Sequence, residues 1–456
     1  MRAMKLHVSL GAFYLPAWLD HLRFRSFVRR QNKRHRMRNG TQSSSPKPSR
    51  KRVAVVSPWF GKGISGGAET AAYGLVEAIQ EYAPEMDIEV LSSTLPEFAQ
   101  DWNTPTHPEG CREENGMVVR RFHTQSTDRE FFDFINGHFL MPGGTDELRT
   151  EANNYRSPIP GCLESYYLMR MVYSPNLLRY IESEWDNYDA FAFIPYMFAT
   201  TVMGCVVAGK KAILIPCLHD ERYACMRVYR QVFQDVRTVL CHVRSEGSLF
   251  RRFYPKAPMP EPLGVQVQTD IPQGDEARFR EKYDIRGPFI LYAGRQVSGK
   301  NVPLLIEYFR SFRAQFPRGS ELQLVLIGKG DLDYSQEPGV RALGFIPPED
   351  KMDAYRAATA LTMLSVNESF SIVMMEAWLQ ETPALVSSQC DVTRDHVLDS
   401  GGGATCGTAE EFCDALCQWL EHPNRANEQG SKGREYVLSN YTAKIIAERF
   451  RDALRA

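Results

Sequence analysis

Short runs of apolar and β-branched residues alternate along this chain with longer stretches in which apolar residues recur at helical spacing. The first run, 52–60, enters a glycine-rich turn and is followed by the stretch 68–83, where Ala71 and Ile79 share one helix face. The next apolar run is 87–93. A strand, a helix and a second strand in this order form a β-α-β unit, so we expect a parallel sheet to begin at the first run.

The same alternation restarts in the second half of the chain, after a polar stretch. Further strands are predicted at 190–195, 211–219, 238–243, 288–295, 322–330, 360–365 and 383–388, and helices at 302–316, 348–358 and 371–380. We therefore predict two α/β domains that join near residue 266. The expected division is a basic N-terminal arm and linker at 1–52, a first domain at 53–265, a second at 266–440, and a C-terminal helix at 441–456 that packs back on the first domain.

Composition changes this picture at one end of the chain. The 456 residues, with 43% hydrophobic content and a net charge of -1, resemble those of an ordinary soluble globular protein. Residues 1–52, however, hold 14 Lys or Arg against a single acid, Asp20, which leaves 40 basic and 54 acidic residues in the rest of the chain. The folded part is therefore acidic, and we expect no nucleic-acid partner.

The head of the chain, MKLHVSLGAFYLPAWLDHLRFRSFVRR, is apolar at first and basic afterwards. A secretory signal has the opposite order, and the apolar run of about 14 residues is shorter than the roughly 20 that span a bilayer. Two interpretations stay open: an unstructured extension or misassigned start, and a basic arm that lies on an anionic membrane. The ten scattered cysteines indicate reduced thiols. We expect a cytoplasmic protein, peripheral on the inner face of the membrane under the second interpretation.

Three short motifs suggest other chemistry, and each lacks a necessary part. GKGISG (61–66) matches the dinucleotide fingerprint, but the second strand ends in two serines instead of the acid that would bind a ribose. GRQVSGKN (294–301) departs from a P-loop because Asn301 stands where a Ser or Thr would hold Mg²⁺. The acid pair in DLD (331–333) is better interpreted as a solvated loop. We therefore expect no metal site.

Taken together, the motifs resemble the family 4 retaining glycosyltransferases of the GT-B fold, which transfer sugars from nucleotide-sugar donors. The pieces occur in order along about 53–450: SGGAE, PCLHDERYA, LGV, AGRQVSGKN, LVLIGKG, ALGFIPPEDKMDAYRAA and NESFSIVMMEAW. The last piece, with two glutamates eight positions apart and an alanine after the second, is the most specific. The resemblance implies a GT-B fold of two doubly wound, Rossmann-like α/β domains facing a central cleft, with the donor mainly on the second domain and the acceptor on the first.

Four charged residues of the second domain are candidates for donor contacts. Arg295 and Lys300 come directly after a strand, at the end of a parallel sheet where ligands bind, so we expect them to neutralise the leaving diphosphate. The resemblance implies that Glu368 contacts hydroxyls of the donor sugar and that Glu376 binds the ribose. The two glutamates then need not act as acid and nucleophile across one bond, as in a glycosidase.

Backbone groups complete the donor site that the resemblance implies. The amides of Phe370, Ser371 and Ile372 lie at the expected start of a helix, where they can contact phosphate or sugar, and Ile346 offers its backbone to the base. The family commonly has glycine where this chain has Ser371. That departure bears on how closely the backbone can approach a ligand.

The first domain contributes two glycines and a histidine. Gly66 and Gly67 open a helix with no side chain in the way, so a phosphate can approach the N–H groups and the positive helix end. His219 resembles the family histidine beside the transferred sugar, although a lone histidine is also a common core or surface residue. The aromatic segment 129–180 either shapes the acceptor side or packs in the core.

The sequence thus predicts a metal-independent, retaining, hexosyltransferase-type glycosyltransferase that needs no cofactor, since the nucleotide-sugar is a substrate. Its catalytic residues are expected to be His219, Arg295, Lys300 and Glu368, and its acceptor a glycan or lipid-linked glycan of cell-surface polysaccharide synthesis. A nucleotide-sugar epimerase of the same fold remains an alternative and would turn over donor without acceptor. An inactive GT-B binding subunit is the other alternative, which the presence of Arg295, Lys300 and Glu368 disfavours.

Overall fold

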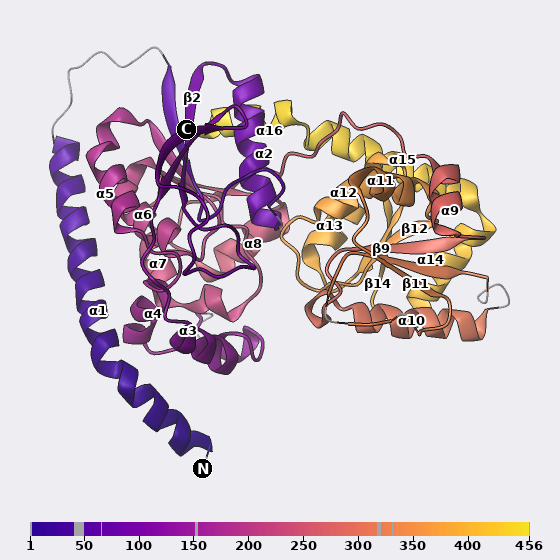
Figure 1. Ribbon diagram of the computed structural model, residues 1–456, viewed down its shortest axis with the longest axis horizontal. Coiled ribbons are helices and arrows are strands. Elements are labelled where there is room, and N and C mark those ends of the chain that lie inside the picture. The colour runs from indigo at the N-terminus through magenta and orange to yellow at the C-terminus, as the bar shows by residue number, and fades with distance from the viewer. Residues whose placement is uncertain are drawn as a thin grey trace. The chain divides into compact units, whose positions relative to one another are not determined.

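The chain folds into two compact units, each built on one sheet. A computed structural model describes residues 2–40, 50–64, 66–150, 154–316, 321–330, 332–334 and 336–455, with the side chains of 2–14, 39, 40 and 298 outside the described set. Unit 1 comprises Met1–Leu263 and Ile446–Ala456, and unit 2 comprises Gly264–Ile445 (Figure 1). The prediction of two Rossmann-like α/β domains is confirmed.

The sheet of unit 1 has eight strands in the order β3-β4-β2-β1-β5-β6-β7-β8, parallel except for the β3–β4 pair. The strands are β1 (Lys51–Val56), β2 (Met86–Ser93), β3 (Gly110–Glu114), β4 (Met117–Phe122), β5 (Ala190–Phe193), β6 (Ala212–Leu214), β7 (Thr238–Cys241) and β8 (Pro260–Pro262). Strand β1 leads to β2 on one side, and β5 later joins on its other side. The strand order therefore reverses between β1 and β5, the position where such sheets bind ligands.

The β3–β4 hairpin was not predicted from the sequence. Its turn consists of Asn115 and Gly116, with φ of 52° and 77°, the conformation that favours Asn-Gly in two-residue hairpins. The outer strand β3 carries no apolar run, because it lies at the edge of the sheet with most side chains exposed. The Asn-Gly pair was the feature of the sequence that could have predicted this hairpin.

The helices of unit 1 are α1 (Arg2–Gly40), α2 (Gly67–Tyr82), α3 (Arg129–Ile135), α4 (Gly161–Leu168), α5 (Pro175–Ser183), α6 (Ala199–Ala208), α7 (Arg227–Phe233), α8 (Arg244–Phe253) and α16 (Ala443–Ala453). Much of the aromatic segment packs in the core: Phe132 is 8% exposed and stacks on Tyr167 at 5.1 Å between ring centroids. At the end of the chain, the carbonyl oxygen of Leu454 accepts from Lys51 and Arg237 at 3.1 Å and 2.9 Å.

Residues 2–40 form the long helix α1, where the sequence suggested an arm or an unstructured extension. Ala17 and Phe24, 0% and 4% exposed, lie on the side of α1 that packs against α4 and α6. Apolar residues at helical spacing form that side of the helix. The overall composition of the segment did not indicate it, because basic residues are in excess there. Residues 41–49 of the expected linker lie outside the described residues. Within the described part of the chain, no helix has the length and apolar character needed to cross a membrane.

Unit 2 has six parallel strands in the order β11-β10-β9-β12-β13-β14. The strands are β9 (Phe289–Ala293), β10 (Gln323–Ile327), β11 (Val340–Gly344), β12 (Ala360–Met363), β13 (Ala384–Ser387) and β14 (Gly403–Cys406). The helices are α9 (Glu276–Tyr283), α10 (Val302–Gln315), α11 (Pro348–Ala357), α12 (Ile372–Leu379), α13 (Asp391–Ser400), α14 (Ala409–Glu421) and α15 (Pro423–Asn440). The strand order reverses between β9 and β12, so the loops after these two strands lie at the expected ligand position.

Candidate active site

Two predicted site residues of unit 2 meet where the strand order reverses. Lys300 lies in the loop after β9 and Glu368 in the loop after β12, and Lys300 Nζ lies 2.7 Å from Glu368 Oε1. Their side chains are 28% and 10% exposed, so the ion pair is partly desolvated. The fold thus joins a cation and a carboxylate that are 68 positions apart in the sequence.

Arg295 begins the same loop, and its side chain is exposed. Its carbonyl oxygen accepts a hydrogen bond of 2.7 Å from the Tyr292 hydroxyl. Burial, together with the nearby Glu368 carboxylate, raises the pKa of Tyr292, which therefore stays a neutral donor. The bond fixes the backbone where the loop leaves β9, while Arg295 itself is exposed to solvent.

Asn301, the residue that departs from the P-loop motif, has a structural role in unit 2. It precedes α10 in a left-handed conformation, with φ of 58°. Its Nδ2 donates to the carbonyl oxygen of Leu364 at 2.9 Å, just beyond the end of β12. An asparagine adopts this backbone conformation more readily than most residues, and its amide links the loop after β9 to that after β12.

Glu376, in the second turn of α12, is held by two side chains of α11. Lys351 Nζ lies 2.8 Å from Glu376 Oε1, and the Tyr355 hydroxyl donates to Oε2 at 3.0 Å. Burial and the Glu376 carboxylate raise the pKa of Tyr355, so it too remains a donor. Lys351 and Tyr355 were not predicted, because a Lys and a Tyr four positions apart are common on helices. The carboxylate retains acceptor positions for a diol.

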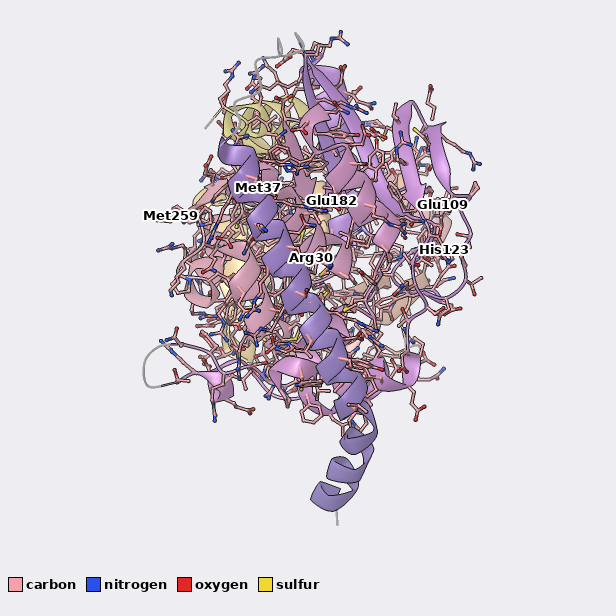
Figure 2. The ribbon with its side chains drawn as sticks, turned by 90° about the vertical axis from the view of Figure 1, so that its left-hand side faces the viewer. Arg30, Met37, Glu109, His123, Glu182 and Met259 are labelled. Atoms are coloured by element: carbon pink, nitrogen blue, oxygen red, sulfur yellow. The ribbon has the colours of Figure 1, made fainter. Side chains whose placement is uncertain are left out.

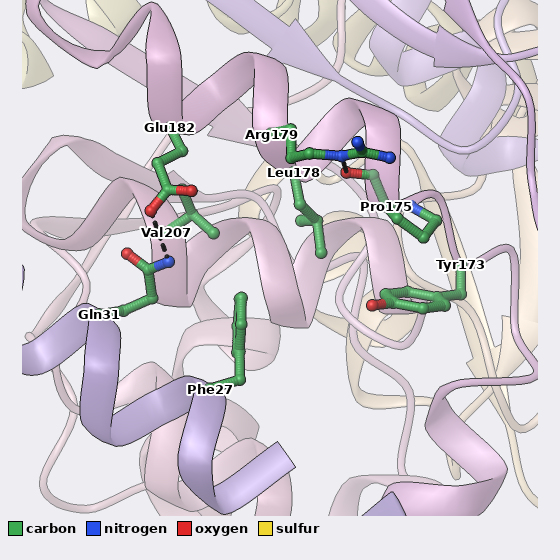
Figure 3. A pocket seen from close by; sticks show the side chains of 8 residues that line it. All are labelled: Phe27, Gln31, Tyr173, Pro175, Leu178, Arg179, Glu182 and Val207. Atoms are coloured by element: carbon green, nitrogen blue, oxygen red, sulfur yellow. Dashed lines mark hydrogen bonds between the residues drawn. The ribbon is translucent and has the colours of Figure 1, made fainter. Parts of the chain in front are cut away.

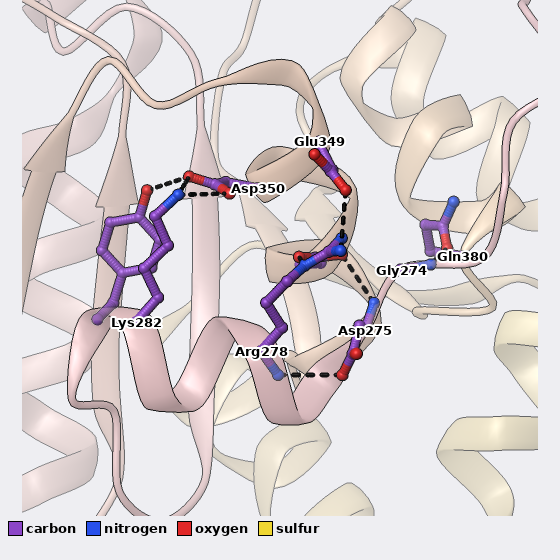
Figure 4. Close-up of polar contacts among 9 residues, drawn as sticks. Gly274, Asp275, Arg278, Lys282, Glu349, Asp350 and Gln380 are labelled. Atoms are coloured by element: carbon purple, nitrogen blue, oxygen red, sulfur yellow. Dashed lines mark hydrogen bonds and ion pairs between the residues drawn. The ribbon is translucent and has the colours of Figure 1, made fainter.

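A polar network fixes α11, and with it the two partners of Glu376 (Figure 4). On α9, Arg278 Nε pairs with Asp353 at 2.6 Å, and Lys282 Nζ pairs with Asp350 at 2.7 Å. Burial would raise the pKa of Asp350, but Lys282 and Tyr283 hold it below its usual value. Cations of α9 thus neutralise the carboxylates of α11.

The start of α12 has a backbone conformation typical of glycine. Ser371 has a φ of 71°, in the left-handed region, and α12 starts at the next residue, the half-buried Ile372. This chain therefore keeps the expected backbone course although it has serine where the family commonly has glycine. Phe370 is 2% exposed, and its ring packs edge-on against Tyr441, at 4.8 Å between centroids, so its side chain belongs to the core of unit 2.

An exposed aromatic residue follows β11, the strand that lies next to β10. The Phe345 side chain is 75% exposed, whereas that of the neighbouring Ile346 is 7% exposed. Phe345 was not singled out in the sequence, because aromatic residues are more often buried. Its ring is accessible at the residue directly before the predicted base contact, and aromatic rings stack on bases.

In unit 1, the glycine-rich loop ends at the start of α2. Gly66 has a φ of 149° and precedes the helix, and a Cβ built on Gly67 would meet no atom within 4 Å. The loop begins near Phe60, whose carbonyl oxygen accepts from the guanidinium of Arg121 at 2.7 Å. Arg121 is 1% exposed and also pairs with Glu114 at 2.6 Å. It is a buried support for the loop that the sequence did not reveal.

His219 lies in the loop after β6 and is half-buried. The N–H of the preceding Leu218 donates to Glu246 Oε1 at 2.7 Å, and the N–H of His242 donates to Oε2 at 2.6 Å. Burial raises the pKa of Glu246 to about 7, although these backbone donors oppose the shift. Glu246, which was not predicted, therefore anchors the loop that carries His219.

The predicted site residues fall in two groups, one in each unit. Unit 2 brings Lys300 and Glu368 into direct contact, and unit 1 holds Gly66 and Gly67 at the start of α2 and His219 in the loop after β6. Across the described ranges, no cluster of three or more His, Cys, Asp or Glu side chains could hold a metal ion.

Most of unit 2 matches a known family. Residues 275–436 match the model of the family described as Glycosyl transferases group 1. A D-inositol 3-phosphate glycosyltransferase of Kineococcus radiotolerans is 28% identical over 224 residues, which cover 42% of this chain and 51% of that protein. The chain spans about half the length of the curated relatives it matches.

Solved structures resemble the whole fold. The sucrose-phosphate synthase of Thermosynechococcus elongatus has a TM-score of 0.63 at 16% identity, over 89% of this chain and 98% of that one. Anabaena Alr3699/HepE, solved in complex with UDP-glucose, has a TM-score of 0.60 at 14% identity, over 89% of this chain and 99% of that one. At these identities the likeness establishes the fold alone. Residues 275–436 thus match the glycosyl transferases group 1, and the chain has the GT-B fold.

Proposed function

We propose that this protein is a retaining, metal-independent glycosyltransferase that moves a sugar from a nucleotide-sugar donor to an acceptor. The observation that carries the proposal is the Lys300–Glu368 pair, at 2.7 Å, where the strand order of unit 2 reverses. Arg295 lies in the same loop with an exposed guanidinium. A partly desolvated carboxylate paired with one cation, with a second cation in the same loop, suits a ligand that carries both sugar hydroxyls and a diphosphate.

The two cations act on the leaving group. Breaking the bond from the anomeric carbon to the diphosphate increases the negative charge on the phosphate oxygens, so fixed cations stabilise the transition state more than the ground state. Lys300 has three N–H donors, and a contact to Glu368 leaves others for a phosphate oxygen. Glu368 orients the ammonium group and accepts hydrogen bonds from hydroxyls of the transferred sugar. Retention of the anomeric configuration follows from the family resemblance.

The remaining contacts bind and orient the donor. Glu376 accepts hydrogen bonds from the ribose hydroxyls, with Lys351 and Tyr355 holding its carboxylate in place. The backbone of Ile346 contacts the base, and the exposed Phe345 ring offers a stacking surface. In unit 1, His219 contacts the transferred sugar.

Further contacts come from backbone groups at two helix starts. Gly66 and Gly67 present the N–H groups at the start of α2 to a phosphate. The amides of Phe370, Ser371 and Ile372, at the start of α12, serve phosphate or sugar in the same way.

The acceptor we propose is a glycan or lipid-linked glycan of cell-surface polysaccharide synthesis, used at the cytoplasmic face of a membrane. Its support is the family resemblance together with the basic segment at the N-terminus. Anabaena Alr3699/HepE was solved with UDP-glucose, which makes UDP-sugars the first donors to test.

The test has two steps. A thermal-shift screen against UDP-, GDP- and ADP-sugars identifies the donor, since a ligand at about 100 times its Kd stabilises the fold by roughly 2.7 kcal/mol. NMR then follows the product anomer with that donor, an acceptor glycan and excess chelator. We expect the donor configuration to be kept and turnover to survive the chelator. An inverted product, or activity restored only by Mg²⁺ or Mn²⁺, would refute the proposal, and donor turnover without acceptor would indicate an epimerase.

A further inference from the structure

The described side chains of α1, those of residues 15–38, fall on two opposite faces, and the inner face packs against α4 and α6. Phe24 is 4% exposed, and Asp20 accepts from Arg170 at 2.9 Å. Gln31 Nε2 donates to Glu182 at 3.0 Å, beside a cavity of about 270 Å³ that Phe27 also lines (Figure 3). Apolar packing and specific hydrogen bonds together set the rotation of the helix, and so determine which residues face outward.

The outer face of α1 carries large apolar side chains in its N-terminal part. Leu15, Trp18, Leu19 and Leu22 are 69%, 53%, 44% and 42% exposed. They are spaced at i, i+3, i+4 and i+7, so they form one continuous stripe along the helix. A contiguous exposed stripe of this kind indicates an interaction site, whereas single exposed apolar residues do not.

The same stripe continues toward the C-terminus of α1 with cations. Five exposed cations lie along the next helical steps, Arg25, Arg29, Arg30, Lys33 and Arg36, together with the exposed Ser26 and Met37. Within the described part of the chain, none of these five side chains forms an ion pair or hydrogen bond. Figure 2 views unit 1 from the side that α1 covers, with Arg30 labelled on the helix. The single acid of residues 1–40, Asp20, is buried on the inner face, where it pairs with Arg170 at 2.9 Å and with the exposed Arg23 at 3.0 Å.

We infer that the outer face of α1, defined by Leu15, Trp18, Leu19, Leu22 and the five cations that follow, docks on an anionic lipid surface. Charge complementarity selects this occupant, because five cations on one face without an acid match a surface of phosphate head groups. Trp and Leu beside Lys and Arg are the composition of helices that lie in the membrane interface. Residues 6–19 contain no charged side chain, so the apolar end of the helix is the end that enters the bilayer.

The docking element is thus a helix held by unit 1 and not a flexible arm. In this arrangement the helix does not span the bilayer, since no described helix is long and apolar enough to cross one. It lies along the surface, with its apolar end inserted and its basic end among head groups. The inference concerns where the protein binds and is independent of catalysis. Only the suggestion that this membrane contact suits a lipid-linked acceptor rests on the proposed function.

Vesicle flotation of the full chain tests the inference. The probes are vesicles of phosphatidylcholine alone and of phosphatidylcholine mixed with phosphatidylglycerol. We expect the protein to float with the anionic vesicles, less so at high salt, and poorly with the neutral ones. Equal binding to both vesicle types, or to neither, would overturn the inference.

Two pairs of variants separate the roles of charge and apolar surface. Arg29→Gln with Lys33→Gln should weaken binding to anionic vesicles roughly thirtyfold at low salt, since each cation near the surface contributes about fivefold. The matched control, Arg112→Gln with Lys256→Gln, removes two exposed cations elsewhere on unit 1 and should bind as the native chain does. If the two double variants lose binding equally, net charge and not α1 is responsible, and the inference fails.

The apolar stripe is tested with Trp18→Ser and Leu22→Ser together, against Val118→Ser and Met259→Ser, which alter side chains 43% and 69% exposed. Only the first pair should lose binding at high salt, where hydrophobic insertion remains. Quenching of tryptophan fluorescence by bromine-labelled lipid should occur in the native chain and diminish in Trp18→Phe. If Trp18 is not quenched, the apolar part of α1 does not insert and the inference fails. If the α1 pair instead abolishes a dimer seen by sedimentation in the absence of lipid, α1 binds a protein and not a membrane.

Discussion

At the scale of single residues, the candidate site depends on how each charge is held. Lys300 is positioned by Glu368 at 2.7 Å, and Glu376 by Lys351 at 2.8 Å. Arg295 is anchored through its backbone, while its guanidinium remains exposed. The charges of Lys300 and Glu376 are thus preorganised, and preorganised charges are effective in catalysis because they need not reorganise when charge develops in the transition state.

Removing one cation should therefore affect turnover more than donor binding. We expect Lys300→Ala and Arg295→Ala each to lower kcat by on the order of a hundredfold or more. Glu376→Ala should mainly raise the donor KM, because a ribose contact exists before and during bond cleavage. Steady-state kinetics at saturating acceptor measures both parameters. Arg286→Ala, which removes a cation whose side chain is 90% exposed, is the control and should change neither.

Glu246 predicts a pH dependence of stability. Its pKa is about 7 in the folded chain against an ordinary value of 4.5, so the folded state keeps a proton that the unfolded state releases between these values. The free energy of unfolding then falls by about 1.4 kcal/mol per pH unit as the pH rises through this window. Glu246→Gln does not titrate and lacks this slope.

The stability lost on Glu246→Gln should accordingly shrink by on the order of 2 kcal/mol between about pH 5 and about pH 8. Denaturant unfolding of both proteins at the two pH values gives the difference. The exposed Glu130→Gln should show the same small change at both. A loss for Glu246→Gln that is independent of pH would mean that Glu246 is ionised throughout.

At the scale of elements, close packing overrides local propensity in unit 2. Helix α15 contains Gly430 and Gly433, which a helix disfavours by about 1 kcal/mol each relative to alanine. A Cβ on Gly433 would lie 2.3 Å from Cδ1 of Trp378, and one on Gly430 would lie 1.9 Å from the carbonyl oxygen of Glu381. The glycines let α15 approach α12, and α12 carries Glu376.

Gly433→Ala should therefore destabilise unit 2 although alanine favours a helix. We expect a net loss of roughly 1–3 kcal/mol, the usual cost of overpacking a filled core. Ser431→Ala changes an exposed position of the same helix and should be neutral or slightly stabilising. Thermal unfolding of the two variants side by side provides the measurement. A stabilised Gly433→Ala would show that Trp378 can move aside.

At the scale of the whole molecule, the two units have separate tasks in the proposed function. Unit 2 holds the donor charges and matches the family over residues 275–436. Unit 1 adds the glycine-rich loop and His219, and it carries α1 on its surface. Ligand binding should therefore slow the hydrogen exchange of backbone amides in some parts of the chain and not in others.

Hydrogen exchange with and without saturating nucleotide detects that difference. We expect slower exchange of the amides in 294–301 and 368–376, because a bound ligand suppresses local opening. The amides of α1 should exchange at the same rate in both samples. Protection confined to unit 1, or spread evenly over both units, would place the nucleotide elsewhere than at the Lys300–Glu368 pair.

The sequence by itself determined the class of the fold and much of the candidate site. Buried parallel strands such as β9 are continuous apolar runs, and the helices between them have helical periodicity, so both are visible locally. Arg295, Lys300, Glu368 and Glu376 were identified because they stand in ordered motifs directly beside such elements. The edge strand β3 escaped because exposure at a sheet edge removes the apolar run.

Only the tertiary structure decided which side chains support that site and which side of the N-terminal helix faces outward. Lys351 reaches Glu376 and Glu246 reaches the backbone beside His219 because distant elements pack together, and no local pattern records contacts at such separations. Helix α1 likewise shows its two faces only when the inner one is docked: composition reports the cations but not the side on which they lie. Burial and side-chain direction are properties of the packed chain, and they decide which side chains of a basic segment face outward.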